Sequence, residues 1–174
     1  MLKTEAFVMG WVQAQAARLE GSSAGKNGQQ AAASWCHPTA GMLKLNVDAA
    51  VRDGFCVLGW CLRDDEGKFV AGVARKRHGR FSALEAELIG IREALSWLRE
   101  SGWRTIEVES DASQVISKVL KGSSISFSHV RRSANKAAHA IAKAACSLSD
   151  SQSWFTIPPL FISFVIDNDL INVN

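Results

Sequence analysis

The chain has 174 residues, of which 47% are hydrophobic and 21% charged, and a formal net charge of +3. That length supports one domain with a buried core and leaves little for a second. The four cysteines include no C-x-x-C pair, which argues against a disulfide scaffold or a zinc site and predicts an intracellular protein, nuclear or cytoplasmic. No apolar run is long enough to cross a membrane.

The first residues differ in composition from the rest of the chain. Residues 4–19 predict an amphipathic helix with Phe7 and Trp11 on one side, and GSSAGKNGQQ, which follows, has the composition of a linker. We therefore expect three parts: an N-terminal helix and flexible linker over 1–34, a domain over 35–148, and a C-terminal tail over 149–174 that docks on the domain.

Three strands are predicted at the start of the domain. In LKLNVD, residues 43–48, apolar and polar residues alternate, and the strand ends on the carboxylate of Asp48. A second strand is predicted over 55–63 and a third over 68–75, joined by a turn in which Gly67 supplies the left-handed residue. Short turns make these strands antiparallel neighbours.

Helices and strands alternate in the rest of the domain. Ser82 and Glu85 have the spacing of a capping box and predict the start of a long helix. The remaining predictions are the end of that helix at Gly102, a strand that ends on Asp111, a helix over 112–121, a strand leading to His129 and an alanine-rich helix over 133–147. Helical crossovers between strands imply an α/β sandwich whose later strands run parallel to the first.

Three acidic residues are candidates for a common site. Asp48 and Asp111 follow strands, where ligands collect in such sheets, and Glu87 lies at the border of the apolar stripe of the long helix. Each acid also has an ordinary interpretation. Asp48 would simply end a strand, Asp111 would cap the next helix, and Glu87 would form an ion pair with Arg92. Converging carboxylates repel one another unless cations neutralise them, and oxygen ligands suit paired Mg²⁺ or Mn²⁺ ions.

Four sequence blocks carry a resemblance to a known family. In order they are NVDAA, AELIGIREAL, VESDAS and FSHV with NKAAHAIAK, spread over about 35–147. They resemble type 1 ribonuclease H, most of all the plant version associated with reverse transcriptases of non-LTR retroelements. The resemblance implies a mixed five-stranded sheet with helices on both faces, its first three strands antiparallel and the fourth and fifth parallel to the first. It also implies a monomeric, metal-dependent endonuclease that cleaves the RNA strand of RNA–DNA hybrids.

The resemblance also implies roles for individual residues. Asp48, Glu87 and Asp111 would bind two Mg²⁺ or Mn²⁺ ions, with Asp48 bridging them. His129 corresponds to a histidine that assists proton transfer or product departure. His139 stands where the family has a fourth carboxylate, so we expect it to act as a catalytic residue and a metal ligand. Because imidazole is a poor ligand for Mg²⁺ and a tolerable one for Mn²⁺, we expect weaker occupancy by the second ion.

Two further features bear on the site. Asn135 matches the asparagine that precedes the fourth acid, and it shares a helix face with His139 at i, i+4 spacing. A helix histidine bonded to Asn135 or to water is the alternative interpretation of His139. Ala49 stands where the family usually has glycine, and its methyl group is expected to crowd the approach of a substrate backbone.

Basic residues are concentrated in two places. We expect these residues and Asn135 to bind nucleic acid through phosphates, with strong salt dependence and little sequence preference. A solvated loop is the alternative for the first group. The basic residues are Arg75, Lys76, Arg77 and Arg80 in RKRHGR, and Arg131 and Arg132.

Three functions remain open at this stage. The first is the hybrid-cleaving enzyme. The second is a retroelement-derived nucleic-acid-binding module that is catalytically weakened through His139 and Ala49. The third is an interaction domain that uses the N-terminal helix and the segment around Trp154.

Overall fold

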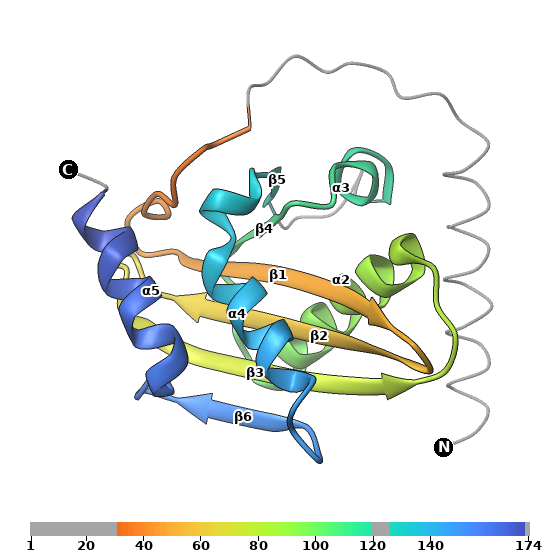
Figure 1. The fold of residues 1–174 in the computed structure, drawn as a ribbon. Helices are drawn as coiled ribbons and strands as arrows, with labels where there is room; N and C mark the ends of the chain where they lie inside the picture. The colour runs from red at the N-terminus through yellow and green to blue at the C-terminus, as the bar shows by residue number, and fades with distance from the viewer. Residues whose placement is uncertain (1–30, 120–125, 173–174) are drawn as a thin grey trace.

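Six strands form one mixed sheet in the order β5-β4-β1-β2-β3-β6 (Figure 1). We describe residues 31–119 and 126–172 of a computed structural model. The strands are β1 (Leu43–Arg52), β2 (Phe55–Arg63), β3 (Phe69–His78), β4 (Ile106–Ser110), β5 (Ser126–His129) and β6 (Gln152–Phe155). The helices are α2 (Ala83–Glu100), α3 (Ser113–Val119), the 3-10 turn η1 (Arg132–Ala134), α4 (Lys136–Ala145) and α5 (Leu160–Ile171). Within these two ranges, no helix combines the length and the apolar character needed to cross a membrane.

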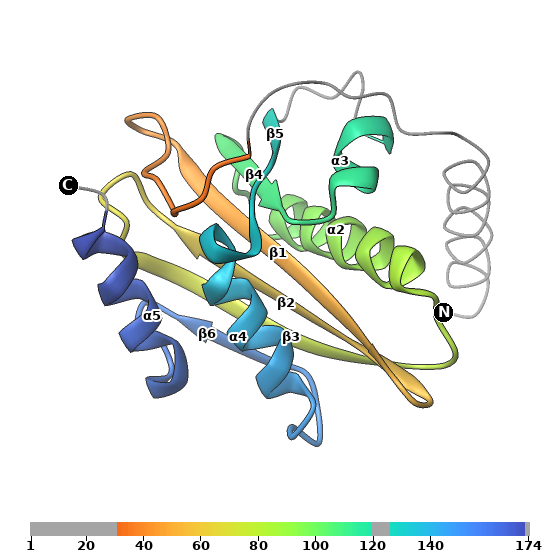
Figure 2. The same ribbon diagram turned by 45° about the horizontal axis from the view of Figure 1, so that its top comes forward.

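Helices cover both faces of the sheet (Figure 1, Figure 2). On one face, α2 packs over a core that includes Leu45 of β1 and Trp60 of β2. On the other face, α4 and α5 cover a second core that contains Val57, Ile141 and Ile162. Because both faces are buried, β2 is apolar along nearly its whole length instead of alternating. The predicted α/β sandwich with helices on both faces is confirmed.

The strand directions agree with the prediction, with one addition. β1 pairs antiparallel with β2 and parallel with β4, and β5 is parallel to β4. The addition is β6, which pairs antiparallel with β3 at the edge of the sheet. Residues 152–155 were not predicted as a strand, because a stretch of four residues that begins with Gln152 and Ser153 shows no clear alternation.

The first strand does not end on Asp48. β1 continues to Arg52, and Asp48 pairs with Gly59 of β2. The parallel pairing of β1 with β4 ends one residue earlier, where Val47 lies opposite Ser110. Asp48 therefore lies just past the point where the parallel pair separates, although the hairpin with β2 carries β1 further.

The last helix of the predicted domain is interrupted near its start. Residues 132–134 form the 3-10 turn η1, and α4 begins at Lys136. Asn135 lies between them with φ −112° and ψ 18°, outside helical geometry. Asn135 and His139 nevertheless keep the expected i, i+4 relation, because the backbone N–H of His139 donates to the Asn135 carbonyl oxygen at 3.1 Å.

A glycine in β2 allows α4 to pack directly on the sheet. A Cβ atom added at Gly59 would lie 2.3 Å from the backbone nitrogen of Ala142 and 2.7 Å from the carbonyl oxygen of Ala138. Only a residue without a side chain fits under a helix backbone at that distance. The alanines of α4 complete this close contact and place His139 over β1.

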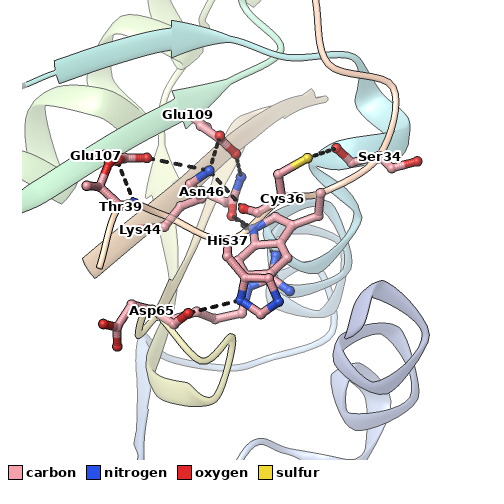
Figure 3. Close-up of polar contacts among 11 residues, drawn as sticks. Ser34, Cys36, His37, Thr39, Lys44, Asn46, Asp65, Glu107 and Glu109 are labelled. Atoms are coloured by element: carbon pink, nitrogen blue, oxygen red, sulfur yellow. Dashed lines mark hydrogen bonds and ion pairs between the residues drawn. The ribbon is translucent and has the colours of Figure 1, made fainter. Parts of the chain in front are cut away.

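Buried polar contacts join the segment before β1 to β1 and β4 (Figure 3). The indole Nε1 of Trp35 donates to Oδ1 of Asn46 at 3.0 Å, and Nδ2 of Asn46 donates to Glu109 at 2.9 Å. Lys44 forms an ion pair with the same glutamate at 2.6 Å. Because unpaired polar groups are costly in a buried setting, these contacts fix β1 against β4 beside the carboxylates described below.

Arg63 anchors α5 to the sheet. Its side chain is 0% exposed, and it forms an ion pair with Asp169 of α5 at 2.9 Å. The guanidinium also lies over the Trp35 ring, 3.6 Å from its centre. The C-terminal helix and the segment before β1 therefore converge on one buried cation.

Candidate metal centre

Three carboxylates from separate parts of the chain meet at one place. Ligand oxygens of Asp48, Glu87 and Asp111 all lie within 4.8 Å of one another. Asp48 comes from β1, Glu87 from α2, and Asp111 is the first residue after β4. The convergence expected from the strand and helix pattern is thus present in the structure.

Local structure explains the position of each carboxylate. The capping box of Ser82 and Glu85 starts α2 as predicted, so Glu87 lies near the N-terminal end of the helix. The nearby backbone N–H of Ala49 acts to lower the pKa of the Glu87 carboxyl. The methyl group of Ala49 packs in the core beneath α2, so the expectation that it crowds a substrate is wrong.

Burial and mutual repulsion perturb the acids. Burial, followed by the charges of Asp48 and Asp111, raises the pKa of Glu87 to about 9. Burial is also the largest cause of the raised pKa of Asp48, to which the charge of Asp111 adds. The Oε2 atom of Glu87 is buried and has no hydrogen-bond partner within the described residues. Clustered oxygens, one of them without a partner, are a donor set that fits a hard divalent cation.

Asn135 connects the start of α4 to two of the surrounding elements. Its Nδ2 atom donates to the Val47 carbonyl oxygen at 2.9 Å and to Oδ1 of Asp111 at 3.2 Å. Asn135 is 1% exposed. One buried amide thus positions both β1 and the third carboxylate, a role that spacing alone could not reveal.

His139 lies against Asp48. Its Nδ1 atom is 2.9 Å from Oδ2 of Asp48 and 3.0 Å from a guanidinium nitrogen of Arg132. One ring nitrogen carries either a proton or a lone pair, so it can satisfy the carboxylate or the guanidinium but not both at once. His139 therefore lies at the centre, as expected. Among the described residues, its ring contacts Asp48 and Arg132. The alternative interpretation, a ring bonded to Asn135, is not what the structure has.

Arg132 is a component of the site that sequence reasoning assigned only to phosphate binding. It lies in η1, seven residues before His139, and its charge lowers the pKa of both Asp48 and Glu87. The spacing of two helical turns was the available signal. The break at Asn135 hid it, because a 3-10 turn does not keep helical phase.

His129 lies at the margin of the centre. It is the last residue of β5, exposed, and paired in register with Ser110. Asp111 follows Ser110 directly, so His129 lies opposite the residue that precedes the third acid. Among the described residues, the cluster of ligand atoms consists of Asp48, Glu87 and Asp111 and does not include His129.

The basic residues of RKRHGR are largely paired within the protein. Arg75 and Arg77 share the carboxylate of Glu93, at 2.7 and 2.6 Å. Lys76 donates to two carbonyl oxygens just after α4. Arg80 is exposed, as are Arg131 and Arg132 in the second group. Of these two groups, Arg80 and Arg131 are therefore the basic side chains most available to a ligand, because Arg132 also contacts His139.

Comparison with known proteins supports this fold. A family model described as reverse transcriptase-like matches residues 46–124. The structure also superimposes on ribonuclease H1 from the halophilic archaeon Halobacterium salinarum with a TM-score of 0.53 and 22% identity, over 62% of this chain and 98% of that one. The domain has a ribonuclease H-like fold. The resemblance seen in the sequence is confirmed at the level of the fold, and so is the predicted topology, with β6 added.

Two further similarities extend the comparison. A protein of Arabidopsis thaliana named "Putative ribonuclease H protein" is 28% identical over 160 residues, which cover 79% of this chain and 26% of that protein. The chain thus spans about a quarter of its plant relative. LC11 ribonuclease H1, solved in complex with an RNA/DNA hybrid, matches with a TM-score of 0.52 and 16% identity, over 60% of this chain and 96% of that one.

Proposed function

We propose that this ribonuclease H-like domain is a metal-dependent endonuclease that cleaves the RNA strand of RNA–DNA hybrids. The observation that carries the proposal is the cluster of Asp48, Glu87 and Asp111, in which a buried carboxylate oxygen lacks a partner. The hybrid bound to a protein of similar fold supports the choice of substrate. Contacts to the 2′-hydroxyls would distinguish the RNA strand from DNA.

Asp48, Glu87 and Asp111 would hold two Mg²⁺ or Mn²⁺ ions. The ions would supply the positive charge that activates water and stabilises the leaving oxygen. Asn135 would orient Asp111, and His139 would complete the ligand set beside Asp48. His129 would assist proton transfer or product departure at the margin of the centre.

Substrate phosphates would lie over the exposed arginines Arg80, Arg131 and Arg132. Arg75, Lys76 and Arg77 would contribute less, because protein groups already occupy their donors. Binding would be salt-sensitive and nearly independent of sequence.

Cleavage of a labelled RNA–DNA hybrid tests the proposal. Wild-type protein should cleave in Mn²⁺ and less well in Mg²⁺, and Asp48→Asn should abolish cleavage. Asp53→Asn is the matched control, because Asp53 is an exposed residue beyond the end of β1. His139→Asp should raise cleavage in Mg²⁺ several-fold, since a carboxylate binds this ion better than imidazole does.

A weakened nucleic-acid-binding module is the second candidate. The contact of Arg132 with the His139 nitrogen favours it, because a guanidinium there opposes a second cation. Salt-dependent binding of the hybrid without cleavage, by wild type and by His139→Asp alike, would support the module and contradict the enzyme.

A further inference from the structure

A basic hollow lies at the end of α2 opposite to the carboxylates. It has a volume of about 620 Å³ and is bounded by the second half of α2, the loop that follows and the start of β4. Pockets for small ligands have volumes in this range. Its lining includes Arg92, Leu95, Arg99, Trp103 and Arg104.

The hollow lies well away from the candidate metal centre. Glu87 and Arg99 are twelve residues apart on one helix, which is about 18 Å along the axis of α2. Ile106, which also lines the hollow, lies five strand residues before Asp111, or about 16 Å. The hollow is therefore a separate feature of the molecule. Figure 2 shows the length of α2 that separates the two ends.

The three arginines of the hollow have side chains that make no polar contact with other described residues. Within the described part of the chain, no hydrogen bond or ion pair involves the side chain of Arg92, Arg99 or Arg104. The nearby acid Glu100 is exposed and accepts a hydrogen bond from Ser96 at 3.1 Å. The hollow thus carries an excess of positive charge, with planar donors suited to phosphate groups.

The backbone at Trp103 is held in a defined position. Gly102 adopts φ +79° after the end of α2, and its N–H donates to the Arg99 carbonyl oxygen. The N–H of Trp103 donates to the carbonyl oxygen of Leu98 at 3.2 Å. These two bonds form a Schellman motif, which fixes the residue that follows the glycine. Trp103 is half-buried, packs against the core and lines the hollow.

We propose that this hollow binds single-stranded nucleic acid. The arginines bind successive phosphates, and a base stacks on Trp103, because guanidinium forks and an aromatic face are the two groups that recognise a strand without reading its sequence. The choice of nucleic acid over an acidic peptide rests on the proposed function. A single-stranded extension of a hybrid would then be held at a distance from the point of cleavage.

Fluorescence anisotropy of a short labelled oligo-dT strand tests this site separately from catalysis. The measurement uses full-length protein carrying Asp48→Asn, in EDTA, so that neither cleavage nor metal contributes. The double variant Arg99→Ala with Arg104→Ala should weaken binding at least tenfold. The slope of log affinity against log salt concentration should also decrease in magnitude by about 1.4, the value for two phosphate contacts on a single strand.

Two further variants control this measurement. Arg52→Ala with Lys143→Ala removes the same charge at exposed positions away from the hollow and should change affinity less than twofold. Trp103→Phe keeps an aromatic ring and the fold, and should weaken binding only a few-fold. Circular dichroism confirms that each variant is folded.

Three results would overturn the proposal. The first is that the Arg52 and Lys143 control weakens binding equally. The second is that the Asp48→Asn protein shows no measurable binding of the strand. The third is that poly-glutamate binds as tightly as oligo-dT, with the same loss in the Arg99 and Arg104 variant. Strand binding that depends on Arg99 and Arg104 in a protein that cleaves no hybrid supports this site and contradicts only the proposed function.

Discussion

At the scale of single residues, burial and the neighbouring acids oppose the ionisation of Glu87. Its folded-state pKa of about 9 exceeds its ordinary value of 4.5, so the folded protein retains a proton that the unfolded chain releases. Stability conferred by the neutral carboxyl is therefore lost as pH rises from about 4.5 to about 9, and it levels off above that range.

Glu87→Gln should accordingly stabilise the metal-free protein at neutral and alkaline pH. We expect its melting temperature at pH 8 in EDTA to rise by several degrees, or about 1–2 kcal/mol, and the gain to disappear near pH 4.5. Thermal unfolding followed by circular dichroism measures both. Glu100→Gln, at an exposed site on the same helix, should show no such pH dependence. A gain that is the same at all pH values would contradict the account.

The residues of the centre differ in how far sequence could predict them. Asp48, Glu87 and Asp111 could be found because strand ends and helix faces follow local periodicity. The role of Arg132 could not, because its contact with His139 depends on the geometry of η1. The partners of Arg75 and Arg77 likewise depend on the packing of β3 against α2, which brings them to Glu93.

At the scale of elements, the contact of α4 with β2 determines where His139 lies. Gly59→Ala would force a methyl group into the backbone of α4, and we expect a loss of about 3 kcal/mol or more in the free energy of unfolding. Gly90→Ala is the matched control in α2, where an added Cβ meets side chains no closer than 3.5 Å. That variant should be neutral or up to about 1 kcal/mol more stable. Urea denaturation compares the two, and equal effects would contradict the described packing.

The ion pair of Arg63 with Asp169 predicts that α5 contributes strongly to stability. Asp169→Asn would leave a buried guanidinium without its counter-charge, at a cost of about 3–5 kcal/mol. Asp167→Asn changes an exposed residue of the same helix and should shift stability by less than about 0.5 kcal/mol. Chemical denaturation of both proteins decides the matter. Similar midpoints would mean that α5 does not depend on this pair.

Sequence predicted the elements unevenly. The capping box and apolar spacing of α2 are local signals, and they fixed its start at the correct residue. The β6 and α5 elements lack such signals. The first half of α5, LFISFVI, is apolar on all sides, so it shows no helical period, and its contact with Arg63 joins residues 106 positions apart.

At the scale of the whole molecule, charge is separated along α2. The sheet brings residues 48, 87 and 111 together at one end of this helix, and three arginines that have no partner among the described residues lie at the other end. Opposite charges at separate ends can hold a cation and a polyanion at the same time without neutralising each other. The molecule is thus suited to a metal site and a strand-binding site on one rigid helix.

Calorimetric titration of the protein with Mn²⁺ tests the central claim, that the three carboxylates form a cation site. The account predicts saturable binding by the wild type and by Asp53→Asn, and loss of that binding in Asp48→Asn and in Glu87→Gln. Equal binding heats in all four proteins would contradict it, because the cation would then bind elsewhere.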